Sequence, residues 1–146
     1  MLQHYMRRCI GFVLLTVLAG CGENGPPPGP PLAAPHPVHG KIAFSDQTPL
    51  KGGVIYFTPV EIHAHGRIRY EAAALVDARG QYQLGFNGDH SGAPAGEYKV
   101  TIQPRDYQEL ANSNTKRIPA RYRDRSKTPL AASVKEGTNT LNFELK

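Results

Sequence analysis

The residues best suited to bind a charged ligand lie in a basic segment, residues 116–127, with the sequence KRIPARYRDRSK. It contains one acidic residue, Asp124, and six basic residues, which are Lys116, Arg117, Arg121, Arg123, Arg125 and Lys127. Guanidinium groups bind phosphates and carboxylates through paired hydrogen bonds, and Tyr122 adds a ring. We therefore consider a site for phosphates or acidic sugars, since an extended chain would place Arg121, Arg123 and Arg125 on one side. The alternative is a solvated loop whose arginines pair with acids elsewhere.

A second group of possible ligands is the sequence EIHAH, which contains Glu61, His63 and His65 at alternate positions. In an extended strand these side chains leave the same face, where a carboxylate and two imidazoles can hold zinc or copper. The pattern offers no fourth ligand, so the favoured interpretation is the polar end of an exposed strand. We expect neither a metal nor another cofactor.

The N-terminus has the pattern of an export signal. Arg7 and Arg8 precede an apolar run from Cys9 to Ala19, which is shorter than the about 20 residues that a membrane-spanning helix needs. We therefore expect residues 1–20 to be a signal peptide. A chain with such a signal is exported.

The signal ends in Leu18-Ala19-Gly20-Cys21, which resembles the lipobox of bacterial lipoproteins at every position. The resemblance implies that the Cys21 sulfur is lipidated, that the chain is cut just before it, and that the new amino group is acylated. Two or three acyl chains anchor a protein stably, whereas one binds marginally. A plain signal peptide is the alternative. Because Gly22 replaces the aspartate that retains lipoproteins at the inner membrane, an outer-membrane location is favoured, on the periplasmic or cell-surface face.

The segment that follows, residues 21–37, is rich in proline and has the composition of a stalk. Proline favours the polyproline II conformation, which rises about 3.1 Å per residue, so the segment would span up to ~50 Å. We expect it to lift a domain off the membrane. A proline-rich ligand for a recognition domain is the alternative.

The cysteine content and the charge of the remaining chain exclude functions that need a thiol and do not favour nucleic acid as a partner. Cys9 leaves with the signal and Cys21 carries lipid, so no thiol is left for a disulfide, a metal site or catalysis. The formal net charge of +5 falls to about +3 without Arg7 and Arg8. We expect no nucleic-acid partner, because this charge does not require one and an exported, lipid-anchored domain rarely meets nucleic acid. Residues 38–146 suffice for one domain with a single core.

Apolar residues with a period of two predict strands throughout this domain. Alternating pairs or triplets occur around residues 38–44, 55–57, 82–86, 98–102 and 141–145, with weaker strands after Tyr70 and near Val134. Turn signals separate them, and Gly80 is expected to adopt a positive φ. The buried set should include Phe57, Tyr98, Val100, Leu141 and Phe143. One short helix is expected in RDYQELANSN, with Asp106 as its cap.

Seven short strands in about 110 residues predict an all-β fold, an antiparallel Greek-key sandwich. The motifs VHGKIAF, TPLKGGVIYFTP, VDARGQYQL, GAPAGEYKVTI, IPARYRDRSKTPL and VKEGTNTLNFEL together resemble small bacterial lipoproteins with a carboxypeptidase-regulatory-like, or transthyretin-like, domain. The resemblance implies a seven-stranded, prealbumin-like sandwich and a role that is mostly non-enzymatic.

These observations predict a membrane-anchored binding or structural module of the cell envelope, with an envelope protein or an anionic polysaccharide as partner. Binding of an anionic carbohydrate or envelope polymer through the basic segment is the first alternative. The second is hydrolysis of 5-hydroxyisourate, a reaction that one transthyretin-like enzyme catalyses. The sequence Tyr122-Arg123-Asp124-Arg125-Ser126 is similar to the C-terminal Tyr-Arg-Gly-Ser of that enzyme. The similar sequence lies inside this chain and replaces glycine by charged residues, so we expect no enzyme.

Overall fold

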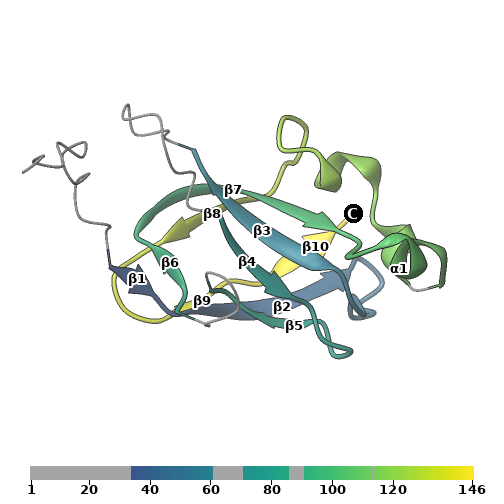
Figure 1. The fold of residues 1–146 in the computed structure, drawn as a ribbon, viewed down its shortest axis with the longest axis horizontal. Coiled ribbons are helices and arrows are strands. Elements are labelled where there is room, and N and C mark those ends of the chain that lie inside the picture. Colours follow the sequence, from purple (N-terminus) through teal and green to yellow (C-terminus); the bar gives the residue numbers. More distant parts are fainter. Residues whose placement is uncertain (1–33, 61–70, 86–90, 113) are drawn as a thin grey trace, which may run out of the picture. The chain divides into compact units, whose positions relative to one another are not determined.

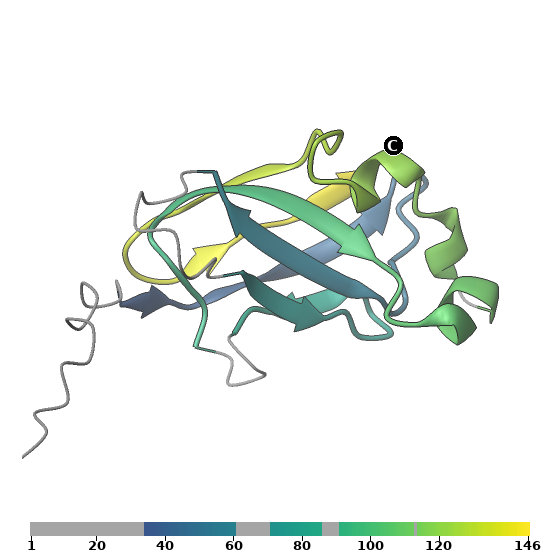
Figure 2. The same cartoon turned by 45° about the horizontal axis from the view of Figure 1, so that its top comes forward.

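Alternating apolar side chains build a β-sandwich in which two sheets enclose a shared core (Figure 1; Figure 2). The computed structural model describes residues 34–60, 71–85, 91–112 and 114–146. The all-β sandwich predicted from the period-two pattern is confirmed.

The first sheet consists of four antiparallel strands in the order β4-β3-β7-β8. Their bounds are Ala72–Leu75 for β4, Val54–Pro59 for β3, Gly96–Gln103 for β7 and Ala131–Val134 for β8. Apolar residues on β3 and β7 are buried at alternate positions, as the sequence predicts. β7 pairs with β8, the next strand along the chain, and also with β3, while β5 lies in the second sheet, so the chain crosses between the sheets after β4 and returns for β7.

The second sheet is centred on β2, which pairs with β5 on one side and with β9 and β10 on the other. The bounds are Val38–Phe44 for β2, Gln81–Gln83 for β5, Asn139–Thr140 for β9 and Phe143–Leu145 for β10. β9 and β10 run parallel to β2, so the expectation of a purely antiparallel sandwich is wrong at the C-terminal strand. Apolar periodicity identifies the buried face of a strand but not the direction of its neighbour.

The closing strand is interrupted at Leu141 and Asn142, so one predicted strand becomes β9 and β10. The carbonyl of Leu141 lies where a side chain on Gly40 would be, and it accepts the Tyr82 hydroxyl at 2.7 Å. Asn142 Oδ1 accepts the main-chain N–H of Lys41 at 2.9 Å. The Leu141 carbonyl and the Asn142 side chain therefore both have hydrogen-bond partners although strand pairing stops between β9 and β10.

A short antiparallel pair, β1 (Pro35–His36) with β6 (Ala93–Pro94), was not expected from the sequence. It places strand pairing before Val38, where we expected the domain to begin. With β1, β6 and the divided closing strand, the described residues contain ten strand segments rather than the seven predicted.

The core is centred on the ring of Phe57, which is fully buried. Its centroid lies 5.8 Å from that of Tyr98, 6.0 Å from that of Phe143 and 6.3 Å from that of Tyr82. The predicted burial of Phe57, Tyr98 and Val100 is confirmed. Leu141 and Phe143 are only partly buried, because they lie at and beside the interruption on the edge of the second sheet. Predictions that involve Tyr70 and Phe86 fall outside the described residues.

The predicted turn and helix signals are confirmed where they can be observed. Gly80 has a φ of 75°, and Asp77 Oδ1 accepts the N–H groups of Arg79 and Gln81, each at 2.8 Å. Helix α1 (Tyr107–Asn112) has Asp106 as its cap, because Asp106 Oδ1 accepts the Glu109 N–H at 2.8 Å.

Two 3-10 helices, η1 (Asn114–Arg117) and η2 (Ala120–Arg123), follow α1. These helices lie at the end of the sandwich opposite β1 (Figure 1; Figure 2). In the part of the chain that the structure describes, no helix has the length and apolar character needed to cross a bilayer.

Candidate functional site

The basic segment begins in η1, contains η2 and ends in a turn. Because η2 is helical, our expectation of an extended chain with Arg121, Arg123 and Arg125 on one side is wrong. The carboxylate of Asp124 closes the turn by accepting the hydroxyl of Ser126 at 2.7 Å and its N–H at 2.8 Å. These hydrogen bonds lower the pKa of Asp124.

Two of the six cations form ion pairs with acidic side chains. Arg117 Nη2 lies 2.6 Å from Asp46 Oδ2, and its guanidinium carbon lies 4.1 Å from the centroid of the Phe44 ring. Lys127 Nζ lies 3.4 Å from Asp124 Oδ2 and remains largely exposed. These two residues follow the alternative interpretation, in which the cations pair with acids.

The other three arginines donate to main-chain oxygens instead. Arg121 Nη2 binds the carbonyl of Lys146, Arg123 Nη2 binds that of Ile118 at 2.9 Å, and Arg125 Nη2 binds that of Pro59 at 2.9 Å. The peptide carbonyls of Ile118 and Pro59 have no net charge, so these two contacts position Arg123 and Arg125 without neutralising them. Together with exposed Lys116, four cations of the segment have no ion pair with a described Asp or Glu side chain.

The sequence predicts that the ring of Tyr122 is available to a ligand. This prediction is wrong, because the side chain is buried. Its hydroxyl accepts the Lys146 N–H at 2.9 Å and lies 3.2 Å from the Lys146 carbonyl oxygen. The guanidinium of Arg121 lies over the same ring, 5.0 Å from its centroid. Tyr122 therefore connects the basic segment by hydrogen bonds to Lys146, the residue after β10.

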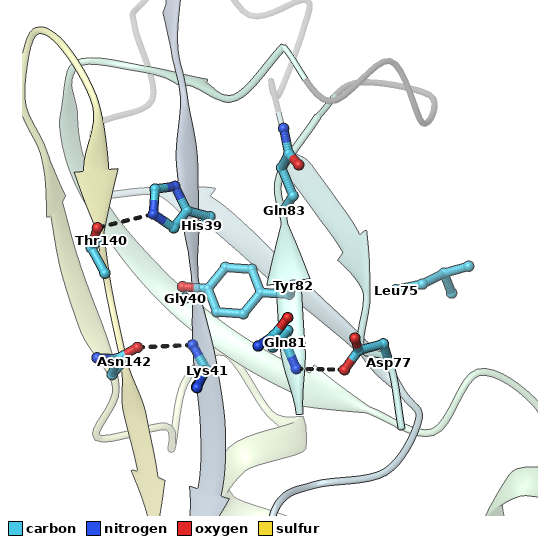
Figure 3. Close-up of a pocket in the computed structure, with 10 residues that line it drawn as sticks. All are labelled: His39, Gly40, Lys41, Leu75, Asp77, Gln81, Tyr82, Gln83, Thr140 and Asn142. Atoms are coloured by element: carbon cyan, nitrogen blue, oxygen red, sulfur yellow. Dashed lines mark hydrogen bonds between the residues drawn. The ribbon is translucent and has the colours of Figure 1, made fainter. Parts of the chain in front are cut away.

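A second candidate site is a polar groove of about 620 Å³ on the outer face of the second sheet (Figure 3). It crosses β2, β5 and β9, where strand pairing brings outward-facing side chains together. The residues that line it are His39, Gly40, Lys41, Leu75, Asp77, Gln81, Tyr82, Gln83, Thr140 and Asn142.

Hydrogen bonds within the polar groove organise one of its walls. His39 Nε2 and Thr140 Oγ1 are 3.0 Å apart, and Figure 3 shows Gln81 and Gln83 on the neighbouring strand. Such amide, hydroxyl and imidazole groups form hydrogen bonds with neutral polar molecules. Sequence reasoning did not identify this groove, because the polar alternation of β2 and β5 is visible in sequence but their adjacency is not.

The metal-site hypothesis concerns residues outside the described part of the chain, since Glu61, His63 and His65 all lie in residues 61–70. Two other histidines are described, and they have different hydrogen-bond partners. His36 Nδ1 accepts the Gly137 N–H at 3.2 Å, whereas His39 faces Thr140. Among the described residues, no group of three or more His, Cys, Asp or Glu side chains could hold a metal ion. Cys21 also lies outside them.

Comparison with known proteins gives no family for this chain. No family model matches it, and no curated protein does. Among solved structures, it is similar to the dioxygenase domain of a dioxygenase carbohydrate-binding protein fusion from the cellulolytic bacterium Streptomyces sp. SirexAA-E. The TM-score is 0.40 and the identity 14%, over 78% of this chain and 80% of that chain. A likeness at this level carries neither an activity nor a ligand from that protein to this one.

Proposed function

We propose that this protein is an exported bacterial lipoprotein whose β-sandwich serves as a non-enzymatic binding or structural module of the cell envelope. The observation that carries the proposal is the order of features along the chain: an apolar signal, Cys21 in a lipobox-like sequence, a proline-rich segment and then the sandwich. Such an order is typical of a domain held at a distance from a membrane. The resemblance to carboxypeptidase-regulatory-like lipoproteins points the same way.

The anchor is tested by replacing Cys21 with serine in the full chain. The wild-type protein should partition into detergent and sediment with membranes, because acyl chains on Cys21 hold it there. The Cys21→Ser variant should appear in the soluble fraction or remain as an uncleaved precursor. If the wild-type protein is soluble, or if the variant stays with membranes after correct cleavage, the lipoprotein proposal fails.

A more specific candidate function is binding of an anionic envelope polymer through the basic segment. Support comes from the four cations that lack an ion pair with a described acidic side chain, three of them oriented by main-chain oxygens. Fixed guanidinium groups lose less conformational freedom on binding than mobile ones. The segment is therefore suited to bind carboxylates or phosphates.

The position of the segment favours a polymer over the lipids of the anchoring membrane. β1, which follows the proline-rich segment, and the basic segment lie at opposite ends of the sandwich (Figure 1; Figure 2). A tether that enters at β1 would allow the basic end to point away from the membrane. The charged surface would then meet components of the envelope beyond the bilayer.

Polymer binding is tested with the double variant Lys116→Gln/Arg125→Gln, since both side chains are exposed and their loss should not unfold the domain. Retention on an immobilised acidic polysaccharide should fall at least tenfold, and wild-type retention should fall as salt rises. Lys135→Gln is the matched control, because this exposed lysine lies just after β8, near β1 at the other end of the sandwich. Equal retention of all three proteins would reject the basic segment as the binding surface.

The hydrolase alternative has a simple assay of its own. Tyr122, the first residue of the sequence that is similar to the hydrolase ending, is buried and bound to the main chain of Lys146. We expect the purified protein to leave 5-hydroxyisourate decay at its spontaneous rate. A rate that rises with protein concentration would contradict the non-enzymatic proposal.

A further inference from the structure

A small hollow of about 250 Å³ lies beside the basic segment, between the chain that leaves β7 and helix η2. It is lined by Pro104, Arg105, Asp106 and Tyr107, which follow β7 along the chain, and by Arg123 of η2. Its size suits one ring-shaped group rather than a long chain, as ligand pockets for whole drug-sized molecules begin near 300 Å³. Of its five lining residues, only Arg123 belongs to the basic segment.

Tyr107 gives this hollow an aromatic rim. Its side chain is 90% exposed, the highest value among the large hydrophobic residues that the structure describes as exposed. An aromatic side chain exposed to this extent contributes little to folding and offers a flat apolar face with a polar tip. Such a ring can stack on the apolar face of a sugar.

Arg123 adds a positive charge to the lining of the hollow. Its Nη2 donates to the Ile118 carbonyl at 2.9 Å, which fixes the side chain in a half-buried position. Its Nε is buried and has no hydrogen-bond partner among the described residues. A partly buried guanidinium without an acidic partner is costly, and an anion bound in the hollow would relieve that cost.

The acid in the hollow does not cancel this charge, because Asp106 is already paired. Its Oδ2 lies 3.4 Å from Arg105 Nε, and its Oδ1 accepts the N–H of Glu109. The hydrogen bond from the Glu109 N–H lowers the pKa of Asp106, with Arg105 adding to the effect. The carboxylate of Glu109 accepts the Arg105 N–H at 2.8 Å and faces Gly52. The net charge of the hollow walls is therefore one positive unit.

We propose that this hollow binds one uronic acid residue of an acidic polysaccharide, with the sugar ring against Tyr107 and its carboxylate directed toward Arg123. The inference rests on the proposed polymer binding and deepens it, because it names the class of sugar and adds Tyr107 to the site. One carboxylate per ring matches the single unpaired charge. A charged polymer without sugar rings would use the basic segment but not Tyr107.

The test measures binding of the full chain in detergent to three probes: oligogalacturonate, inorganic polyphosphate and neutral dextran. Tyr107→Ala should weaken oligogalacturonate binding about tenfold and change polyphosphate binding less than twofold, because only the sugar uses the ring. Tyr107→Phe should bind like the wild type. Val60→Ala is the matched control, since Val60 is another exposed apolar residue and lines neither the hollow nor the polar groove. Thermal melts should show that all variants are folded.

The outcomes separate this inference from the function on which it rests. If Tyr107→Ala binds oligogalacturonate like the wild type, or loses both polyanions equally, the hollow is not a uronate site. Dextran binding as strong as that of oligogalacturonate would also overturn it, because the carboxylate would then be unnecessary. In these cases, an effect of Lys116→Gln/Arg125→Gln would leave the proposed function standing. A wild-type protein that binds neither polyanion rejects both proposals.

Discussion

At the scale of single residues, Asp46 shows how an exposed carboxylate can organise a surface. Hydrogen bonds from the hydroxyl and the N–H of Thr48, followed by the one from Arg117, hold the pKa of Asp46 at about 2. Arg117 also donates to the Thr48 hydroxyl at 3.0 Å. The cluster therefore connects the turn after β2 to η1.

This pKa predicts a specific acid sensitivity. An unfolded aspartate titrates near pH 4, so the charged Asp46 favours the folded state above about pH 4, and that contribution is lost as the pH falls toward about 2. Asp46→Asn should therefore lower stability at neutral pH and flatten its decline between those two values. Urea unfolding followed across this range checks the prediction, and an unchanged pH dependence in the variant would contradict it. High salt should reduce the effect, because the group is exposed.

Two phenylalanines in contact provide a test of the core. Phe57 is fully buried, whereas Phe143 lies on edge strand β10 and is only partly buried. Phe57→Ala should lower the free energy of unfolding by about 3–5 kcal/mol, and Phe143→Ala by less, since less apolar surface loses its cover. Chemical denaturation of both variants gives the comparison. A greater loss for Phe143 would mean that the edge of the second sheet is covered in solution.

At the scale of elements, the interrupted closing strand depends on a glycine in β2. A Cβ on Gly40 would overlap the carbonyl of Leu141 and approach the Tyr82 ring at 3.1 Å. We expect Gly40→Ala to displace β9 from β2 and to lower the free energy of unfolding by about 1–3 kcal/mol. Melting curves and amide exchange at Leu141 would report it. An unaltered exchange rate there would show that the strand does not pass over Gly40.

The strands differ in how much of their pairing can be predicted from the sequence. Period-two alternation located β2, β3, β7 and the buried faces of β3 and β7, because burial of one face is a local property of a strand. The parallel pairing of β10 with β2 depends on how the chain crosses between sheets, which no local pattern records. β1 and β6 have two residues each, too few for any alternation.

The candidate sites divide in the same way. Composition identified the basic segment, but only the fold reveals that Arg121 and Arg125 bind main-chain oxygens from other parts of the chain and that Arg123 binds one within the segment. The ring of Tyr122 could be assigned to a ligand or to the core by its sequence, and it belongs to the core. The sequence did not identify Tyr107 as a site residue, because the sequence of a short helix does not show whether an aromatic side chain is exposed or buried.

At the scale of the whole molecule, the proposed function depends on a division between two ends. β1 and the turn at Gly137 lie at one end of the sandwich, where the His36 imidazole accepts the Gly137 N–H. The basic segment and α1 lie at the other. A chain tethered through residues 21–37 would enter at the first end and present its uncompensated positive charge at the second.

The proposed arrangement depends on a lipid at Cys21, which can be detected from the intact mass of the protein purified from the membranes of a bacterium that makes it. We expect a chain that begins at Cys21 and is heavier than residues 21–146 by a lipid group, with fragmentation placing the added mass on Cys21. A mature chain that begins at another residue, or an unmodified Cys21 in the membrane fraction, would contradict it.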